Sequence, residues 1–151
     1  DICITNPGDI KDLFGIVSDK ADFDLKKPDN EGAASVAEKL MKRYPLKGPA
    51  LTLRTNLSAS DNDFGAMLCN GEATVFSRKY RMHIADRVGG GDAFAAGLIY
   101  SLLKQKAPQD AVEFATAAAV LKHSIEGDFN RVTVSEVESL VKGDGSGRVQ
   151  R

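Results

Sequence analysis

A run of glycines that ends in an aspartate and leads directly into an apolar helical pattern constrains this chain most. The glycines are residues 89–91 and the acid is Asp92. Glycine backbone can approach a ligand closely and can adopt positive φ, and a helix N-terminus presents unpaired N–H groups and the positive end of a dipole. The stretch predicts an anion site with a carboxylate at its rim, as phosphoryl transfer needs. The alternative is a flexible loop with Asp92 as an ordinary helix N-cap.

Two common nucleotide-binding motifs are excluded at this loop. No lysine follows the glycines at the spacing of a P-loop. The dinucleotide fingerprint Gly-x-Gly-x-x-Gly also fails, because Phe94 occupies the position of its third glycine.

Composition narrows the class of protein. The chain has 151 residues, a formal net charge of −1 and 42% hydrophobic residues, which fits one globular domain and gives no electrostatic reason to expect nucleic acid or an anionic membrane as a partner. We find no apolar run long enough to span a bilayer and no secretory pattern. Cys3 and Cys69 lie far apart and form no metal-binding spacing. These features favour reduced thiols and a cytoplasmic location.

Hydrophobic periodicity and turn residues predict an α/β fold with a mainly parallel sheet and one antiparallel hairpin. Asn70-Gly71 predicts a type I′ turn in that hairpin. Phe94, Leu98, Ile99 and Leu102 are predicted to share one apolar helix face. We expect one unit over residues 1–142 and a mobile tail over 143–151. The expected strands are 1–5, 50–53, 64–69, 72–77 and 80–85, and the expected helices are 7–15, 31–44, 92–104, 108–121 and 135–141.

The whole glycine-rich string is more specific than its parts. It reads Asp86-x-x-Gly89-x-Gly91-Asp92-x-Phe94-x-x-Gly97. This pattern resembles the C-terminal signature of the ribokinase-like (PfkB) carbohydrate kinases, usually Asp-Thr-x-Gly-Ala-Gly-Asp-x-Phe, with Arg87 in place of Thr and Gly90 in place of Ala. The string, residues 121–130 and residues 147–151 are most similar to the branch that phosphorylates 2-keto-3-deoxygluconate.

The resemblance implies a ribokinase-like three-layer α/β/α fold, of which this chain would be the C-terminal half. The implied reaction transfers a phosphoryl group from ATP, with Mg²⁺, to a hydroxyl of a sugar acid. A monovalent cation such as K⁺ would assist, and the missing N-terminal half would carry most of the sugar pocket and a dimerising lid. Two alternatives stay open: another sugar kinase of the family, such as a fructokinase, and a non-catalytic nucleotide-binding fragment or module.

The resemblance also assigns roles within the signature. Asp92 would take the proton from the attacking hydroxyl, and the N–H groups of Gly89, Gly90 and Gly91 would bind the ATP phosphates. Asp86 would help to bind the monovalent cation, although a solvated loop carboxylate or a partner for Arg87 is an equal alternative.

Other candidate residues lie outside the signature. Asn6 and Asp9 lie where the resembled family usually has Asn-x-x-Glu, a motif that organises Mg²⁺ through water, and Asp9 is one methylene shorter than that Glu. An N-cap followed by an acid in the first helical turn explains the two residues equally well. Arg54 could reach a phosphate through its guanidinium or could be a surface arginine. By resemblance the second apolar helix and the loop after it form the adenine side of the pocket, and His123 could instead cap that helix. The nucleotide-pocket candidates are Arg54, Thr116, Ala119, His123 and Asn130.

Overall fold

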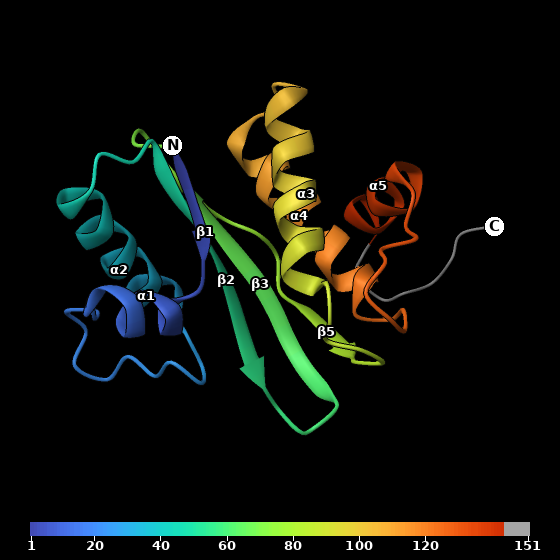
Figure 1. Ribbon diagram of the computed structural model, residues 1–151, viewed down its shortest axis with the longest axis horizontal. Coiled ribbons are helices and arrows are strands. Elements are labelled where there is room, and N and C mark those ends of the chain that lie inside the picture. The colour runs from blue at the N-terminus through green and yellow to red at the C-terminus, as the bar shows by residue number, and fades with distance from the viewer. Residues whose placement is uncertain (144–151) are drawn as a thin grey trace.

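The computed structural model describes residues 1–143, in which one mixed sheet is covered by helices on both faces (Figure 1). The expected tail over 143–151 lies almost wholly outside the described residues. The strands are β1 (Ile2–Thr5), β2 (Gly48–Asn56), β3 (Asp61–Cys69), β4 (Thr74–Phe76) and β5 (Tyr80–His83). The helices are α1 (Pro7–Phe14), α2 (Asn30–Arg43), α3 (Gly90–Leu103), α4 (Pro108–Lys122) and α5 (Val134–Lys142).

The α/β class is confirmed, but the strand directions differ from the expected mainly parallel sheet. Only β1 and β2 pair in parallel among the described strands, whereas β3 pairs antiparallel with β2, β4 and β5. The connections explain the difference. Two helices and a loop separate β1 from β2, which gives the chain room to return to the same end of the sheet. Short loops from β2 to β3 and from β3 to β4 reverse the chain direction, whereas β4 and β5 run in the same direction along successive parts of β3.

The hairpin from β3 to β4 is present, but its turn is not the predicted type I′. That turn needs positive φ at both central residues, and among the described residues other than glycine only Gln105 has positive φ. The Asn70 side chain instead accepts hydrogen bonds from the N–H groups of Glu72 and Ala73, at 3.1 and 2.8 Å. These bonds organise a four-residue loop, because an asparagine side chain can take the place of a backbone acceptor in a turn.

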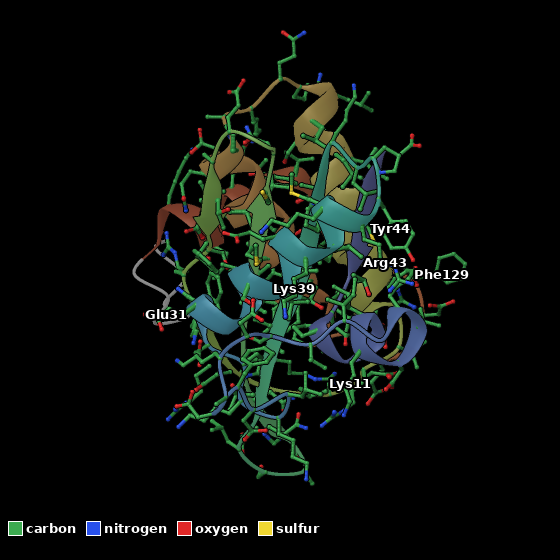
Figure 2. The ribbon with its side chains drawn as sticks, turned by 90° about the vertical axis from the view of Figure 1, so that its left-hand side faces the viewer. Lys11, Glu31, Lys39, Arg43, Tyr44 and Phe129 are labelled. Atoms are coloured by element: carbon green, nitrogen blue, oxygen red, sulfur yellow. The ribbon has the colours of Figure 1, made fainter. Side chains whose placement is uncertain are left out.

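Alternating residues of the central strands divide the core into two layers. Leu51 and Met67 face α1 and α2, while Ala50 and Leu68 face α3 and α4. Helix α2 also holds the loop after α1: Lys39 donates to the carbonyl of Val17, and Arg43 to that of Phe14 (Figure 2). No helix within residues 1–143 is long and apolar enough to cross a membrane.

Helices α3 and α4 run antiparallel and share the core with the sheet. The start of α3 therefore lies beside the end of α4, at the end of the sheet where the parallel strands β1 and β2 finish (Figure 1). The close packing of the pair requires Gly97, because a Cβ there would lie 3.0 Å from the backbone of Ala115.

We therefore expect Gly97→Ala to lower the free energy of unfolding by about 1 to 3 kcal/mol, since overpacking forces the two helices apart. Urea unfolding measures the change. Ala96→Ser on the exposed side of the same helix is the control and should change stability by about 0.5 kcal/mol. Equal effects of the two substitutions would contradict the packing argument.

Candidate functional site

The glycine loop, residues 86–92, follows β5 and includes the first residues of α3. It leaves the N-terminal end of that helix open. Gly89 is the N-cap, with φ of 75°, and the helix begins at Gly90 without a side-chain cap. Asp92 is thus not an N-cap: it lies exposed in the first turn, and its carboxylate makes no hydrogen bond within residues 1–143. Among the same residues, the N–H groups of Gly91 and Asp92 have no acceptor. This geometry leaves the helix end free to bind an anion.

Gly90 is where the loop contacts the end of α4. A Cβ on Gly90 would lie 2.4 Å from Cε1 of His123, so the backbone packs directly on the imidazole ring. The main-chain oxygen of His123 in turn accepts hydrogen bonds from the N–H groups of Ala85 and Asp86, at 2.8 and 3.2 Å. The first residue of α3 and the cap of α4 therefore form one packed unit.

His123 is a helix cap, as one of the two sequence-based interpretations proposed. It is 3% exposed, and its Nδ1 lies 2.6 Å from the carbonyl oxygen of Ala119. A carbonyl can only accept, so Nδ1 carries the hydrogen. Burial lowers the pKa of His123, against a smaller opposing effect of the Ala119 hydrogen bond. The imidazole is therefore neutral, and its ring packs against the backbone of the glycine loop at Gly90.

Asp86 ties the glycine loop to the segment that follows α4. One carboxylate oxygen accepts from the N–H of Val88 at 2.9 Å, and the other accepts from the N–H of Gly127 at 2.8 Å. These two bonds, that of Val88 first, lower the pKa of Asp86. The alternative of an Arg87 partner is not found among the described residues, because the Arg87 guanidinium donates to the carbonyl of Ala59 instead.

Positive charge gathers around the open end of α3. Arg54 projects from β2, and burial together with the nearby Arg87 lowers the pKa of its guanidinium. Neither arginine forms a salt bridge within residues 1–143. Two arginines close enough to repel, without an acidic partner, favour an anion between them or beside them.

Asn6 and Asp9 lie at the carboxyl end of β1 and bind each other. Asn6 caps α1 by accepting from the N–H of Asp9 at 3.0 Å, and its amide donates to the Asp9 carboxylate at 2.6 Å. The N-cap interpretation is thus confirmed. One oxygen of Asp9 has no partner among the described residues. A single free hard oxygen suits a Mg²⁺ ion that keeps most of its water.

The remaining pocket candidates lie in less suitable places. Thr116 and Ala119 are 0% exposed inside α4, and the Thr116 hydroxyl donates to the carbonyl of Val112. Their expected role as lining residues is not supported, because neither presents surface to a ligand. Asn130 is exposed, and its side chain accepts from the N–H of Val132 at 3.1 Å.

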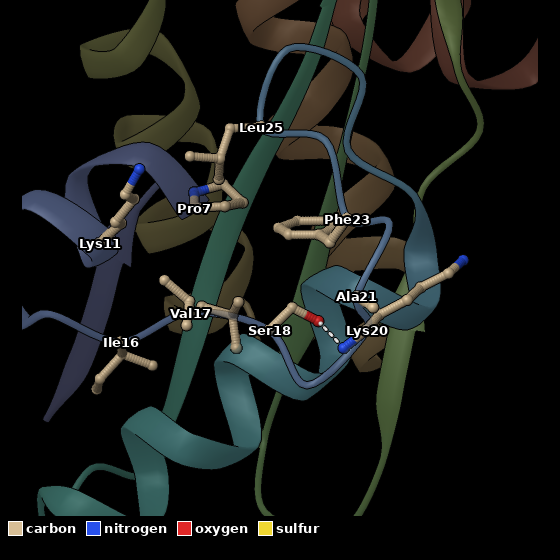
Figure 3. A pocket seen from close by; sticks show the side chains of 10 residues that line it. Pro7, Lys11, Ile16, Val17, Ser18, Lys20, Ala21, Phe23 and Leu25 are labelled. Carbon is tan, nitrogen blue, oxygen red and sulfur yellow. Dashed lines mark hydrogen bonds between the residues drawn. The ribbon is translucent and has the colours of Figure 1, made fainter.

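A separate pocket lies on the other face of the sheet (Figure 3). It is formed by α1, α2 and the loop between them, and its apolar lining includes Ile16, Val17 and Phe23. The glycine loop contributes nothing to it, so it is not part of the site.

Sequence reasoning missed one charged residue of this region, Lys122. The side chain is 0% exposed and lies under the glycine loop, where a Cβ on Gly89 would be 3.1 Å from its Cε. A signal was present: Lys122 follows Ala115 and Ala119 on the buried side of a helix whose residues 115–119 are all alanine or threonine. A charged residue at a position that the helical periodicity predicts to be buried is the signal by which Lys122 could have been recognised.

Comparisons with known proteins agree with the signature. The model of the pfkB family carbohydrate kinases matches residues 57–130, which include the glycine loop. A solved 2-dehydro-3-deoxygluconokinase from Thermotoga maritima is 38% identical, with a TM-score of 0.86, over 95% of this chain and 42% of its own. A Listeria grayi PfkB family carbohydrate kinase is 31% identical, with a TM-score of 0.77, over 93% and 41%.

A curated relative also matches. The 2-dehydro-3-deoxygalactonokinase of Haloferax volcanii is 30% identical over 112 residues, which are 68% of this chain and 35% of that protein. The likeness to ribokinase-like carbohydrate kinases is therefore confirmed, and it extends to the fold. The chain spans less than half the length of these three relatives.

The contact of Gly90 with His123 yields a matched pair of substitutions. Gly90→Ala should lower the free energy of unfolding by about 1 to 3 kcal/mol, because its Cβ would overlap the imidazole. Gly91→Ala has open space and should leave stability nearly unchanged. Any loss of phosphate binding by Gly91→Ala would then come from contact between the new methyl group and the phosphate, and not from a change in protein stability. Chemical denaturation and ADP titration measure the two effects. A Gly91→Ala protein as unstable as Gly90→Ala would contradict this description.

The burial of His123 predicts how stability varies with pH. Its folded pKa lies below the usual value of about 6.5, so between these two values the unfolded chain binds more protons. The contribution of the buried, neutral His123 to the free energy of unfolding should therefore be complete above pH 7. It should fall as pH drops below about 6.5, by at most about 1.4 kcal/mol per pH unit. His123→Gln should flatten this slope in urea titrations. A His123→Gln protein with the same slope as the wild type would contradict this attribution.

Proposed function

We propose, on the premise that this chain is a relative of the pfkB family carbohydrate kinases, that it forms the nucleotide-binding and catalytic part of an ATP-dependent sugar kinase. The complete protein would then phosphorylate a hydroxyl of 2-keto-3-deoxygluconate. Since the chain spans less than half of its relatives, we place the residues that select the sugar outside it.

The observation that carries this proposal is the open end of α3 with Asp92 beside it. Within residues 1–143 the free N–H groups, the helix dipole and two arginines that form no salt bridge provide an anion site. Asp92 stands in the same first turn and makes no hydrogen bond within residues 1–143, so its carboxylate is available to a ligand.

The residues present suit phosphoryl transfer. The sugar hydroxyl oxygen would attack the γ-phosphorus, the bond from phosphorus to the ADP oxygen would break, and the hydroxyl proton would pass to Asp92. The N–H groups of Gly91 and Asp92 would bind the negative oxygens around phosphorus. Such catalysis depends on positioning and charge stabilisation more than on a strong base, so an ordinary carboxylate is sufficient.

Magnesium would be held mainly by phosphate oxygens and water. Asp9 offers one unpartnered carboxylate oxygen, and the strand before it ends at the same edge of the sheet as β2. Magnesium commonly binds through one or two carboxylates together with substrate phosphates. When bound, it would neutralise charge that develops on the phosphates.

The sugar acid is inferred from the relatives. The Thermotoga maritima enzyme is named for 2-dehydro-3-deoxygluconate and the Haloferax volcanii enzyme for the galactonate. We propose the gluconate because the structure named for it is the more similar of the two, at 38% against 30% identity.

A sugar panel with the complete protein that carries this chain tests the proposal. We expect ATP consumption with 2-keto-3-deoxygluconate, and less with its galactonate epimer, fructose and ribose. Preference for fructose would make the protein a different kinase of the family. Nucleotide binding without phosphorylation of any sugar would favour a non-catalytic module and overturn the proposal.

Asp92→Ala should separate catalysis from binding. Loss of the proton acceptor should lower kcat by about 10² to 10⁴ while nucleotide affinity is kept, because the N–H groups remain. Steady-state rates and ADP titration measure the two quantities. Asp110→Ala is a matched control, since Asp110 is an exposed acid in the first turn of α4. Wild-type turnover by the Asp92 variant would remove Asp92 from the mechanism.

A further inference from the structure

Lys122 places a fully buried positive charge beside the glycine loop. It is 0% exposed, and no carboxylate lies within salt-bridge distance of its ammonium among residues 1–143. In the part of the chain that the structure describes, its one hydrogen-bond partner is the carbonyl oxygen of Ile125, at 3.1 Å. Burying a charge without a salt bridge is unfavourable, and apolar residues of similar size would fill the space at lower free energy. The charge therefore calls for an explanation beyond packing.

The position of Lys122 supplies that explanation. Its Cε lies against Gly89, the residue that caps α3. Its ammonium also contributes to lowering the pKa of Asp86, whose two oxygens join the glycine loop to Gly127. Lys122 thus lies in the space between the helix end that would bind phosphate and the loop that follows α4.

A monovalent cation would fit this region poorly. Such an ion needs oxygen ligands, and each carboxylate oxygen of Asp86 and the carbonyl of Ile125 already accepts one hydrogen bond, so at most one lone pair remains on each for an ion. An additional cation would also be repelled by the buried ammonium. The nearby ammonium therefore argues against the expected role of Asp86 as a cation ligand.

We propose that the Lys122 ammonium is a built-in cation of the phosphate site, so that the protein binds nucleotide without K⁺. This inference rests on the proposed function, since it assumes that the glycine loop binds nucleotide phosphates. The ammonium stabilises negative charge at the loop and holds residues 125–128 against Gly89. Lys122 acts here as a positioning residue, because the N–H groups of the loop make the phosphate contacts.

The test compares ADP binding by the complete protein in potassium chloride, ammonium chloride and tetramethylammonium chloride at equal ionic strength. We expect the wild-type affinity to be the same in all three salts within about twofold. Lys122→Met should bind ADP about tenfold more weakly in tetramethylammonium, the loss expected for a charge-assisted interaction. Potassium or ammonium, which can enter the vacated space, should restore much of that affinity.

Lys104→Met, which removes an exposed lysine at the far end of α3, is the matched control and should bind like wild type in every salt. Thermal unfolding without nucleotide gives a second readout: potassium should raise the Tm of Lys122→Met and leave that of wild type unchanged. The wild-type measurements remain decisive even if Lys122→Met does not fold.

Three results would overturn the inference. The first is wild-type ADP binding that needs potassium, and the second is a Lys122→Met protein that binds normally in tetramethylammonium. The third is a loss that neither ion restores, which would reduce Lys122 to a packing role. If the wild type binds no nucleotide in any salt, the proposed function itself fails and this inference fails with it.

Discussion

The contact between the backbone of Gly90 and the ring of His123 is the constraint on which the site depends. It requires a residue without Cβ at the start of α3, and it requires a neutral, buried imidazole at the end of α4. With these two helix ends in contact, the main-chain oxygen of His123 can accept from Ala85 and Asp86 and so fix the entry to the loop. The direction in which the free N–H groups of α3 point follows from this contact.

The same contact creates an electrostatic problem that nearby groups solve. The C-terminus of a helix carries partial negative charge, and here it lies beside the helix N-terminus that would bind an anion. The carbonyl of Ala119 is satisfied by the ring and backbone of His123, and that of Leu121 by Ser124. Lys122 adds a full positive charge at the same point. The end of α4 therefore does not cancel the positive potential at the start of α3.

Local patterns predicted the parts of the structure that depend on neighbouring residues. The glycine loop, the helix after it and the caps Asn6 and His123 follow from turn chemistry and periodicity. The strand directions and the buried Lys122 depend on contacts between distant segments, which periodicity does not report. Ile99 and Leu102, expected on the buried face of α3, are 52% and 38% exposed, because no described segment covers that side of the helix.

Arg87, which replaces the threonine of the family signature, also makes a contact with a segment that is distant in the sequence. A threonine at this position could not reach the β2–β3 loop, whereas the Arg87 guanidinium donates to the carbonyl of Ala59 at 3.0 Å. That bond joins the glycine loop to the hairpin whose first strand carries Arg54. Burial first, and then the nearby Arg87 guanidinium, lower the pKa of Arg54, so the two like charges are unfavourable for the empty protein. A bound phosphate or carboxylate would add an attraction to each guanidinium, which would offset their mutual repulsion and favour anion binding.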